Sequence, residues 1–169
     1  MKKLFTIAMT ALALFSGAVY AQQKPSPATT ATGTLANGTV ITINYGAPAL
    51  NGRVIGKDVE PMEGKVWRAG ANEATVFEVS KDVTINGKKL PAGKYGFFTM
   101  NNGKEWTLIF NKTWKQWGAF NYKEADDQLR VTVQAGQSAS APERLTYSVG
   151  QNGLVSLNWG TILVSFTVK

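Results

Sequence analysis

Two segments of this chain concentrate side chains that could bind a ligand. The first runs from Trp67 to Glu73 and brings an indole, the Arg68 guanidinium, the Asn72 amide and a carboxylate into seven positions. An arginine can stack on an indole and pair with a carboxylate at the same time. The segment therefore predicts either a recognition site for a carboxylate or sugar, or an internal Arg68–Glu73 ion pair that orders a loop. We expect the ion pair, because structural ion pairs are common.

The second segment places four aromatic rings in nine residues, at Trp114, Trp117, Phe120 and Tyr122, with Gly118 permitting a sharp turn. Exposed rings offer apolar faces on which sugars or apolar ligands can lie. The alternative is that the rings pack over one open end of the fold. Packing is the interpretation we favour, because large aromatic side chains usually bury most of their surface.

The acidic residues predict no defined catalytic pair. Glu124, Asp126 and Asp127 lie close together, but they lack the alternating ligands of a calcium loop and predict a solvated turn. Glycoside hydrolysis needs two carboxyl groups about 5–9.5 Å apart, and nothing in the spacing of the acids selects two of them. A hydrolase or isomerase that uses Glu73, Asp126 or Asp127 as its general base remains an alternative function.

Composition excludes several classes of site. The chain has 169 residues and contains neither His nor Cys, so it builds no Ser-His-Asp triad, Cys-His dyad, His/Cys zinc cluster or disulfide. We expect no metal and no cofactor. Its 18 Lys and Arg outnumber 11 Asp and Glu, but the cations are scattered rather than clustered along one run. This scatter predicts no nucleic-acid partner; the oligomeric state stays open.

The N-terminus has the layout of a secretory signal. Lys2 and Lys3 precede an uncharged apolar run, and Val19-Tyr20-Ala21 is a suitable cleavage site. We expect residues 1–21 to be removed on export to the periplasm or beyond, leaving no stable membrane span. Residues 22–38 are rich in Ala, Thr, Pro and Ser and predict a flexible leader.

From Thr39 onward the apolar residues alternate with polar ones. Ile41, Ile43 and Tyr45 share one face, and similar runs recur to the C-terminus with polar turns between them. Asn86-Gly87 and residues 101–104 predict tight hairpins. We therefore expect residues 39–169 to form a single all-β domain, an antiparallel β-sandwich of about eight to ten short strands. A closed β-barrel is the alternative, because periodicity does not separate the two.

Six ordered blocks carry a resemblance to a known family. They are Tyr45–Pro48 with Asn51–Arg53, Val66–Thr75, Ile85–Tyr95, Trp106–Asn111, Gln116–Ala119 and Asp127–Val131. Through them the chain, from about Ile41 to the C-terminus, resembles the domain-of-unknown-function family 2911, a group of exported bacterial proteins. The family often carries Arg where this chain has Ala47 and Lys where it has Asn51. The resemblance implies an exported location and a shared fold, but no reaction.

The family blocks coincide with the two candidate segments, and they add Arg53 to a shared site. The sequence favours a non-enzymatic binding module for a polar or glycan-like ligand, with the hydrolase or isomerase and a structural envelope protein as alternatives. The ligand-binding candidates are Arg53, Trp67, Arg68, Asn72, Glu73, Trp114, Trp117 and Tyr122.

Overall fold

The computed structural model describes residues 26–169. The signal peptide expected at residues 1–21 lies outside these residues, as do residues 22–25 of the expected leader. The described chain forms twelve strands: β1 (Ala28–Thr34), β2 (Val40–Gly46), β3 (Val66–Trp67), β4 (Thr75–Val79), β5 (Val83–Ile85), β6 (Lys88–Leu90), β7 (Gly93–Asn102), β8 (Glu105–Asn111), β9 (Asp127–Gln137), β10 (Thr146–Val149), β11 (Leu154–Trp159) and β12 (Ile162–Thr167).

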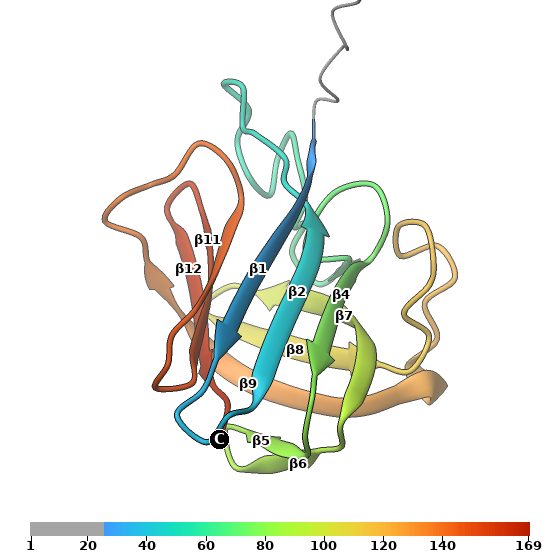
Figure 1. Ribbon diagram of the computed structural model, residues 1–169. Helices are drawn as coiled ribbons and strands as arrows, with labels where there is room; N and C mark the ends of the chain where they lie inside the picture. Colours follow the sequence, from blue (N-terminus) through green and yellow to red (C-terminus); the bar gives the residue numbers. More distant parts are fainter. Residues whose placement is uncertain (1–25) are drawn as a thin grey trace, which may run out of the picture.

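Ten of these strands belong to one antiparallel sheet. Its order is β1-β2-β4-β7-β8-β9-β12-β11-β10, and β3 pairs with β7. The sheet curls so that its two edges meet: Figure 1 shows β11 and β12 beside β1, with β8 and β9 behind β2 and β4. Just beyond the edge strands, the amide of Ala36 donates a hydrogen bond of 3.2 Å to the carbonyl of Gln151. The predicted all-β antiparallel fold is confirmed, and the sheet comes close to the barrel alternative.

The segment from Ala28 to Thr34 corrects the leader prediction. These residues form β1, which pairs along its whole length with β2. Their side chains alternate: Ala31 and Gly33 point toward the interior, whereas Thr30 and Thr32 are exposed. Small residues and threonines give a weak hydrophobic pattern, so the strand is specified mainly by the backbone hydrogen bonds that β2 offers.

The interior of the barrel is filled by side chains. Phe77, Phe97, Phe110 and Phe166 come from four different strands, and their ring centroids lie 5.2–6.2 Å apart. Each of these rings is at most 3% exposed. A small barrel is commonly filled in this way. Because the interior is packed, a ligand has to bind on the outer surface or at an end of the barrel.

The two predicted hairpins are present. Asn86 and Gly87 both have positive φ, 46° and 85°, in the turn between β5 and β6, as a type I′ turn requires. Gly103 has a φ of 79° in the turn between β7 and β8.

Within residues 26–169 the helical structure is one short 3₁₀ turn, Glu124–Asp126, and no helix there is long and apolar enough to cross a membrane.

Candidate functional site

The structure separates Arg68 from Glu73, and the ion pair predicted between them is wrong. Arg68 lines a cleft that also contains Glu60, whereas exposed Glu73 lines a groove with the tryptophans. No ion pair between the two is among those of the described residues. The backbone between them turns twice, because Ala69 and Asn72 have φ values of 51° and 65°. Left-handed residues reverse the direction of the chain, and this sends the two side chains to different sites.

The groove beside Glu73 brings the two candidate segments together. It encloses about 350 Å³ on the outer side of the barrel. Its floor is apolar, made by Ala74 and Val76. We call it the aromatic groove; its lining residues are Glu73, Ala74, Val76, Trp114, Lys115, Gln116 and Trp117.

Backbone hydrogen bonds hold the two walls of the aromatic groove together. The amide of Ala74 donates to the carbonyl of Gln116 at 2.9 Å, and the amide of Gly118 donates to the carbonyl of Asn72 at 3.0 Å. Glu73 and Trp117 are thereby opposed as in a short antiparallel bridge. Main-chain bonds of this kind fix the position of Trp117 without using its side chain.

Trp114 is placed against the sheet by the absence of a side chain at Gly96. A Cβ at Gly96 would lie 2.9 Å from the carbonyl oxygen of Thr113 and 3.3 Å from the Cα of Trp114. The loop therefore rests directly on the backbone of β7. Above it, the Nζ of Lys94 lies 5.6 Å from the Trp114 ring centroid and 3.3 Å from the Glu78 carboxylate. The cation over the ring limits the positions that the indole can take.

The two tryptophans of the groove are exposed on the outside of the barrel, so the prediction that they pack over an open end is wrong. Trp114 is 38% exposed and Trp117 is 56% exposed. Exposed apolar side chains that gather in one patch can mark a binding site. Gln116 also lines the groove, and its Nε2 donates to the carbonyl of Thr113 at 2.7 Å.

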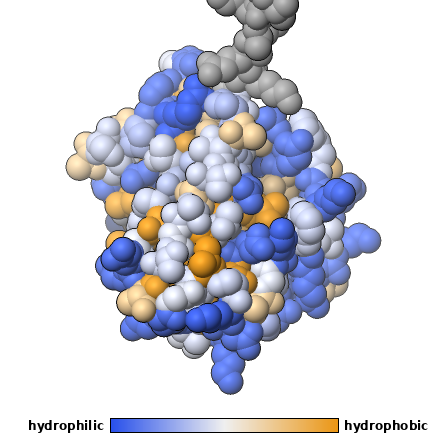
Figure 2. All heavy atoms as spheres, in the orientation of Figure 1, coloured by the Kyte–Doolittle hydropathy of each residue, from blue (hydrophilic) through white to orange (hydrophobic). Residues whose placement is uncertain are grey.

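A second hollow extends the aromatic groove across the sheet. It encloses about 260 Å³ and shares Glu73, Ala74 and Val76 with the groove. Thr30 and Asn44 form its far side, with Thr30 Oγ1 donating to Asn44 Oδ1 at 2.7 Å. In Figure 2 the middle of the face over β1 and β2 is pale and orange, with strongly hydrophilic blue residues around it. A ligand longer than the groove could extend over this weakly polar surface of β1 and β2.

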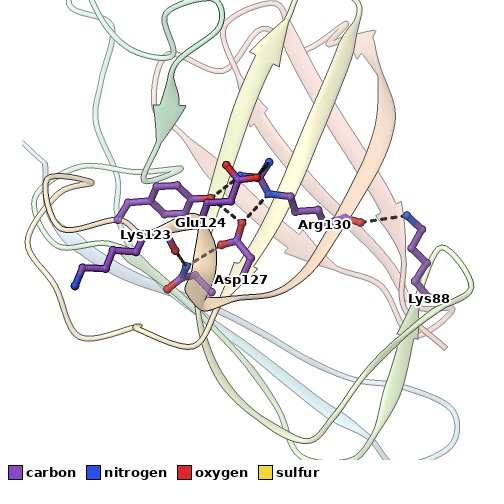
Figure 3. Close-up of polar contacts among 7 residues, drawn as sticks. Lys88, Lys123, Glu124, Asp127 and Arg130 are labelled. Carbon is purple, nitrogen blue, oxygen red and sulfur yellow. Dashed lines mark hydrogen bonds and ion pairs between the residues drawn. The ribbon is translucent and has the colours of Figure 1, made fainter.

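Tyr122 lies outside the groove, in a polar cluster at the start of β9. Its hydroxyl donates to Asp127 Oδ2 at 2.7 Å and accepts from Arg130 Nη2 at 2.6 Å. Arg130 also pairs with Asp127 at 2.6 Å and with Glu124 at 3.2 Å. Figure 3 shows Glu124 and Asp127 converging on Arg130, whose carbonyl accepts a bond from Lys88.

The same tyrosine belongs to a small outer core. Its ring lies 5.2 Å from that of Phe98, which is fully buried although it points away from the barrel interior. Ile109 is buried in the same cluster, and Ala119 packs against it. The loop between β8 and β9 thus covers the outer face of β7 and β8. Tyr122 is therefore packed, but on the outer face of the sheet and not over an open end, where we expected it.

The remaining candidates lie around a cleft at the end of the barrel where β2 terminates. Figure 1 shows the loops that follow β2 and β3 at this end of the barrel. The cleft that these loops line encloses about 230 Å³. Its lining includes Arg53, Trp67, Arg68 and Asn72 from the predicted set. We call it the Arg68 cleft; the lining residues that the sequence did not single out are Ser26, Pro48, Val59, Glu60, Gly70, Ala71 and Trp159.

Two of the predicted residues in the Arg68 cleft have structural partners. Trp67 is 2% exposed, stacks on Trp159 at 5.9 Å and donates its Nε1–H to the carbonyl of Gly70 at 3.1 Å. Arg53 donates to the carbonyls of Leu50 and Ala49 at 2.9 and 2.7 Å. These bonds tie the loop after β2 to itself and give the cleft its wall.

Arg68 differs from Arg53 because its Nε is buried and has no hydrogen-bond partner among the described residues. Burial lowers the pKa of Arg68, and the charge of nearby Glu60 partly offsets this effect. Asn72 borders both the Arg68 cleft and the hollow beside the aromatic groove, and its Nδ2 donates to the carbonyl of Ser26 at 3.0 Å.

The acidic residues of the described chain do not gather as metal ligands: no group of three or more of them in residues 26–169 could hold a metal ion. Lys115, Gln116 and Val76 in the aromatic groove and Glu60 in the cleft were not predicted from the sequence. The three polar residues are in loops and carry no periodic signal, and Val76 is an ordinary strand residue of β4, so only the fold shows that they line a site.

Comparison with known proteins agrees with the resemblance seen in the sequence. No curated protein and no solved structure matched the chain. A family model described as "Protein of unknown function (DUF2911)" matches residues 26–168, which is nearly all of the described structure and includes β1. The chain therefore belongs to the DUF2911 family, as its six ordered sequence blocks predict.

Proposed function

We propose that this protein is a non-enzymatic binding module that acts outside the cytoplasm and holds a glycan-like ligand in the aromatic groove. The positively charged start, apolar run and cleavage site at residues 1–21 support the location. The geometry of the groove supports the ligand class. The observation that carries the proposal is the exposure of Trp114 and Trp117 in the lining of one groove with an apolar floor.

A sugar ring has an apolar C–H face and a rim of hydroxyl groups, and the groove offers partners for both. The indoles of Trp114 and Trp117 provide rigid surfaces that lose little conformational entropy on binding. The Glu73 carboxylate accepts hydrogen bonds, and the Lys115 ammonium donates them. Apolar walls with a few converging polar groups are typical of ligand sites.

The volume of the groove suits a short oligosaccharide. Ligand pockets usually enclose about 300–1,000 Å³, and the aromatic groove encloses about 350 Å³. The adjoining hollow at Thr30 and Asn44 adds about 260 Å³ in line with it. We infer that one sugar stacks on the tryptophans and that its neighbours lie along the outer face of β2 and β4.

The test is a binding measurement with Trp117→Ala and a matched control. Phe120 is on the same loop and is 84% exposed, but it does not line the groove. We expect calorimetry with cellohexaose, xylohexaose and chitohexaose to detect at least one ligand. Trp117→Ala should weaken it about tenfold or more, because a stacked aromatic ring contributes roughly 1.4 kcal/mol or more in a well-formed site. Phe120→Ala should bind as the unaltered protein does.

Two results would contradict the proposal. One is the absence of binding by any of the three oligosaccharides. The other is an equal loss of affinity in Trp117→Ala and Phe120→Ala, which would show that the groove itself is not the site. Circular dichroism spectra of both variants should match the unaltered protein, because neither ring is part of the barrel core.

A further inference from the structure

The Arg68 cleft holds a guanidinium that forms no ion pair with the residues the structure describes. We propose that this cleft is a second binding site, separate from the aromatic groove, and that it takes a small organic monocarboxylate. The two sites use different side chains except at Asn72, which borders the cleft and the hollow next to the groove. The proposal stands independently of the glycan-binding function.

The Arg68 guanidinium has an N–H donor that lacks an acceptor among the described residues. Its side chain forms no ion pair among residues 26–169, and its buried Nε has no hydrogen-bond partner there. A buried donor without a partner is costly for a folded protein, so such groups usually have a function. A guanidinium presents parallel N–H groups whose spacing matches the two oxygens of a carboxylate. A carboxylate bound to the part of the guanidinium that lines the cleft would pair with its charge.

The charges around the cleft favour an anion with a single charge. Arg53 and Arg68 line it with two positive charges, and Glu60 lines it with one negative charge. The Glu60 carboxylate also accepts a hydrogen bond at its Oε2 from the amide of Met62, at 2.7 Å. The cleft therefore has one uncompensated positive charge. A phosphate, which carries about two negative charges when bound, would be repelled by Glu60 more strongly than a monocarboxylate.

The walls of the cleft favour a ligand with an apolar body. Pro48, Val59 and the stacked pair Trp67 and Trp159 line the cleft together with Arg68. Both rings are almost fully buried, and their indole N–H groups are bonded to the backbone carbonyls of Gly70 and Glu143, so they add no hydrogen-bond donor to the cleft. The volume of about 230 Å³ is small and suits a compact acid.

Buried hydrogen bonds anchor the loop that carries Arg68. The carbonyl of Ala69 accepts two hydrogen bonds, from Thr75 Oγ1 at 3.0 Å and from the Tyr147 hydroxyl at 2.7 Å. Ala69 is fully buried and has a φ of 51°, which is unfavourable for a residue with a side chain. Strain of this kind at a site often reflects a backbone that is held ready for a ligand.

The test uses benzoate, acetate and inorganic phosphate as probes, with binding followed by ¹H–¹⁵N NMR shifts of the backbone amides at residues 69–72. We expect saturable binding of benzoate, weaker binding of acetate and the weakest binding of phosphate. Arg68→Gln should lower benzoate affinity about tenfold or more. Glu60→Gln should raise it several-fold, because the amide keeps an acceptor for Met62 and removes the repelling charge.

Matched controls separate this site from general charge and from the groove. Lys89→Gln removes one positive charge on exposed β6 and should leave benzoate affinity unchanged. Trp117→Ala should also leave it unchanged, so loss of the glycan site and loss of this one are distinguishable.

Four outcomes would overturn the proposal: no saturation by about 50 mM benzoate, unaltered affinity in Arg68→Gln, tighter binding of phosphate than of benzoate, or weaker benzoate binding in Glu60→Gln. If Arg68→Gln fails to fold, the Glu60→Gln result and the order of the three probes decide the question.

Discussion

At the scale of single residues, the cluster around Tyr122 shows how a candidate ligand residue becomes a structural one. Its hydroxyl lies between the Asp127 carboxylate and the Arg130 guanidinium, at 2.7 and 2.6 Å. Burial raises the pKa of Tyr122 to about 12, and the hydrogen bond to Asp127 adds to this effect, whereas Arg130 opposes it. The neutral hydroxyl is therefore part of the folded state.

This cluster predicts a loss of stability at high pH. A tyrosine in the unfolded chain has a pKa near 10, so the folded state binds the Tyr122 proton more tightly than the unfolded state does. The stabilisation is fully present below about pH 10 and is lost as the pH rises toward about 12. Urea unfolding at about pH 9 and about pH 11 should show a smaller decrease in the free energy of unfolding for Tyr122→Phe than for the unaltered protein.

A comparison with the unaltered protein is needed because burial also raises the pKa of Tyr95 and Tyr147. Tyr122→Phe and the unaltered protein both retain these two tyrosines, so the contribution of Tyr95 and Tyr147 to the pH dependence cancels in the comparison. If the free energy of unfolding depends on pH identically in the two proteins, the pKa of Tyr122 is not raised by folding, and the prediction is wrong.

At the scale of secondary-structure elements, close contact between β2 and the loop after β3 determines where Arg68 lies. The amide of Ala71 donates to the carbonyl of Gly46 at 3.1 Å. A Cβ at Gly46 would collide with the carbonyl oxygen of Ala71, and one at Gly70 would lie 2.7 Å from Thr75 Oγ1. The loop reaches its position because these two residues have no side chains.

Gly46→Ala should therefore destabilise the protein more than Gly87→Ala. At Gly46 the new methyl group must displace the loop that carries Arg68, and overpacking of this kind costs roughly 1–3 kcal/mol or more. At Gly87 a Cβ meets nothing within 4 Å, but the residue has a φ of 85°, so only backbone strain of about 1 kcal/mol applies. Urea unfolding of the two variants gives the order, and equal midpoints would contradict the close contact at Gly46.

At the scale of the whole molecule, closure of the sheet depends on the seam between β1 and β10. The two edge strands meet where Gly33 faces Val149: a Cβ at Gly33 would lie 2.6 Å from Val149 Cγ1 and 2.8 Å from the Val149 carbonyl oxygen. At the other end, the hydroxyl of Tyr45 accepts a 3.3 Å hydrogen bond from the amide of Tyr147. Edge strands that are covered in this way are protected from pairing with other chains.

We expect Gly33→Ala to open this seam, and Gly136→Ala is the matched control. Gly136 lies in β9, and a Cβ there would make ordinary contacts of 3.7 Å or more with Leu163. Gly33→Ala should lose roughly 1–3 kcal/mol of stability and show faster hydrogen exchange at the amides of β1 and β10. Exchange rates that stay the same in both variants would mean that the seam does not hold the barrel together.

The local features of this protein are determined by its sequence. Alternation at Ile41, Ile43 and Tyr45 predicts the inward face of β2, and Asn86-Gly87 predicts the β5–β6 turn; both are present. Such features are predictable because strand pleating and positive φ act within a few neighbouring residues. The sequence also identified Trp117 and Glu73, which line one groove in the structure.

Only the tertiary structure decided how these elements combine. The threonine-rich segment at Ala28–Thr34 is a strand because β2 offers it an edge, and the sheet curls until β1 meets β10. Arg68 and Glu73 are five positions apart, but two left-handed residues direct them into different sites. These outcomes depend on contacts between residues far apart in the chain, and a local pattern carries no information about such contacts.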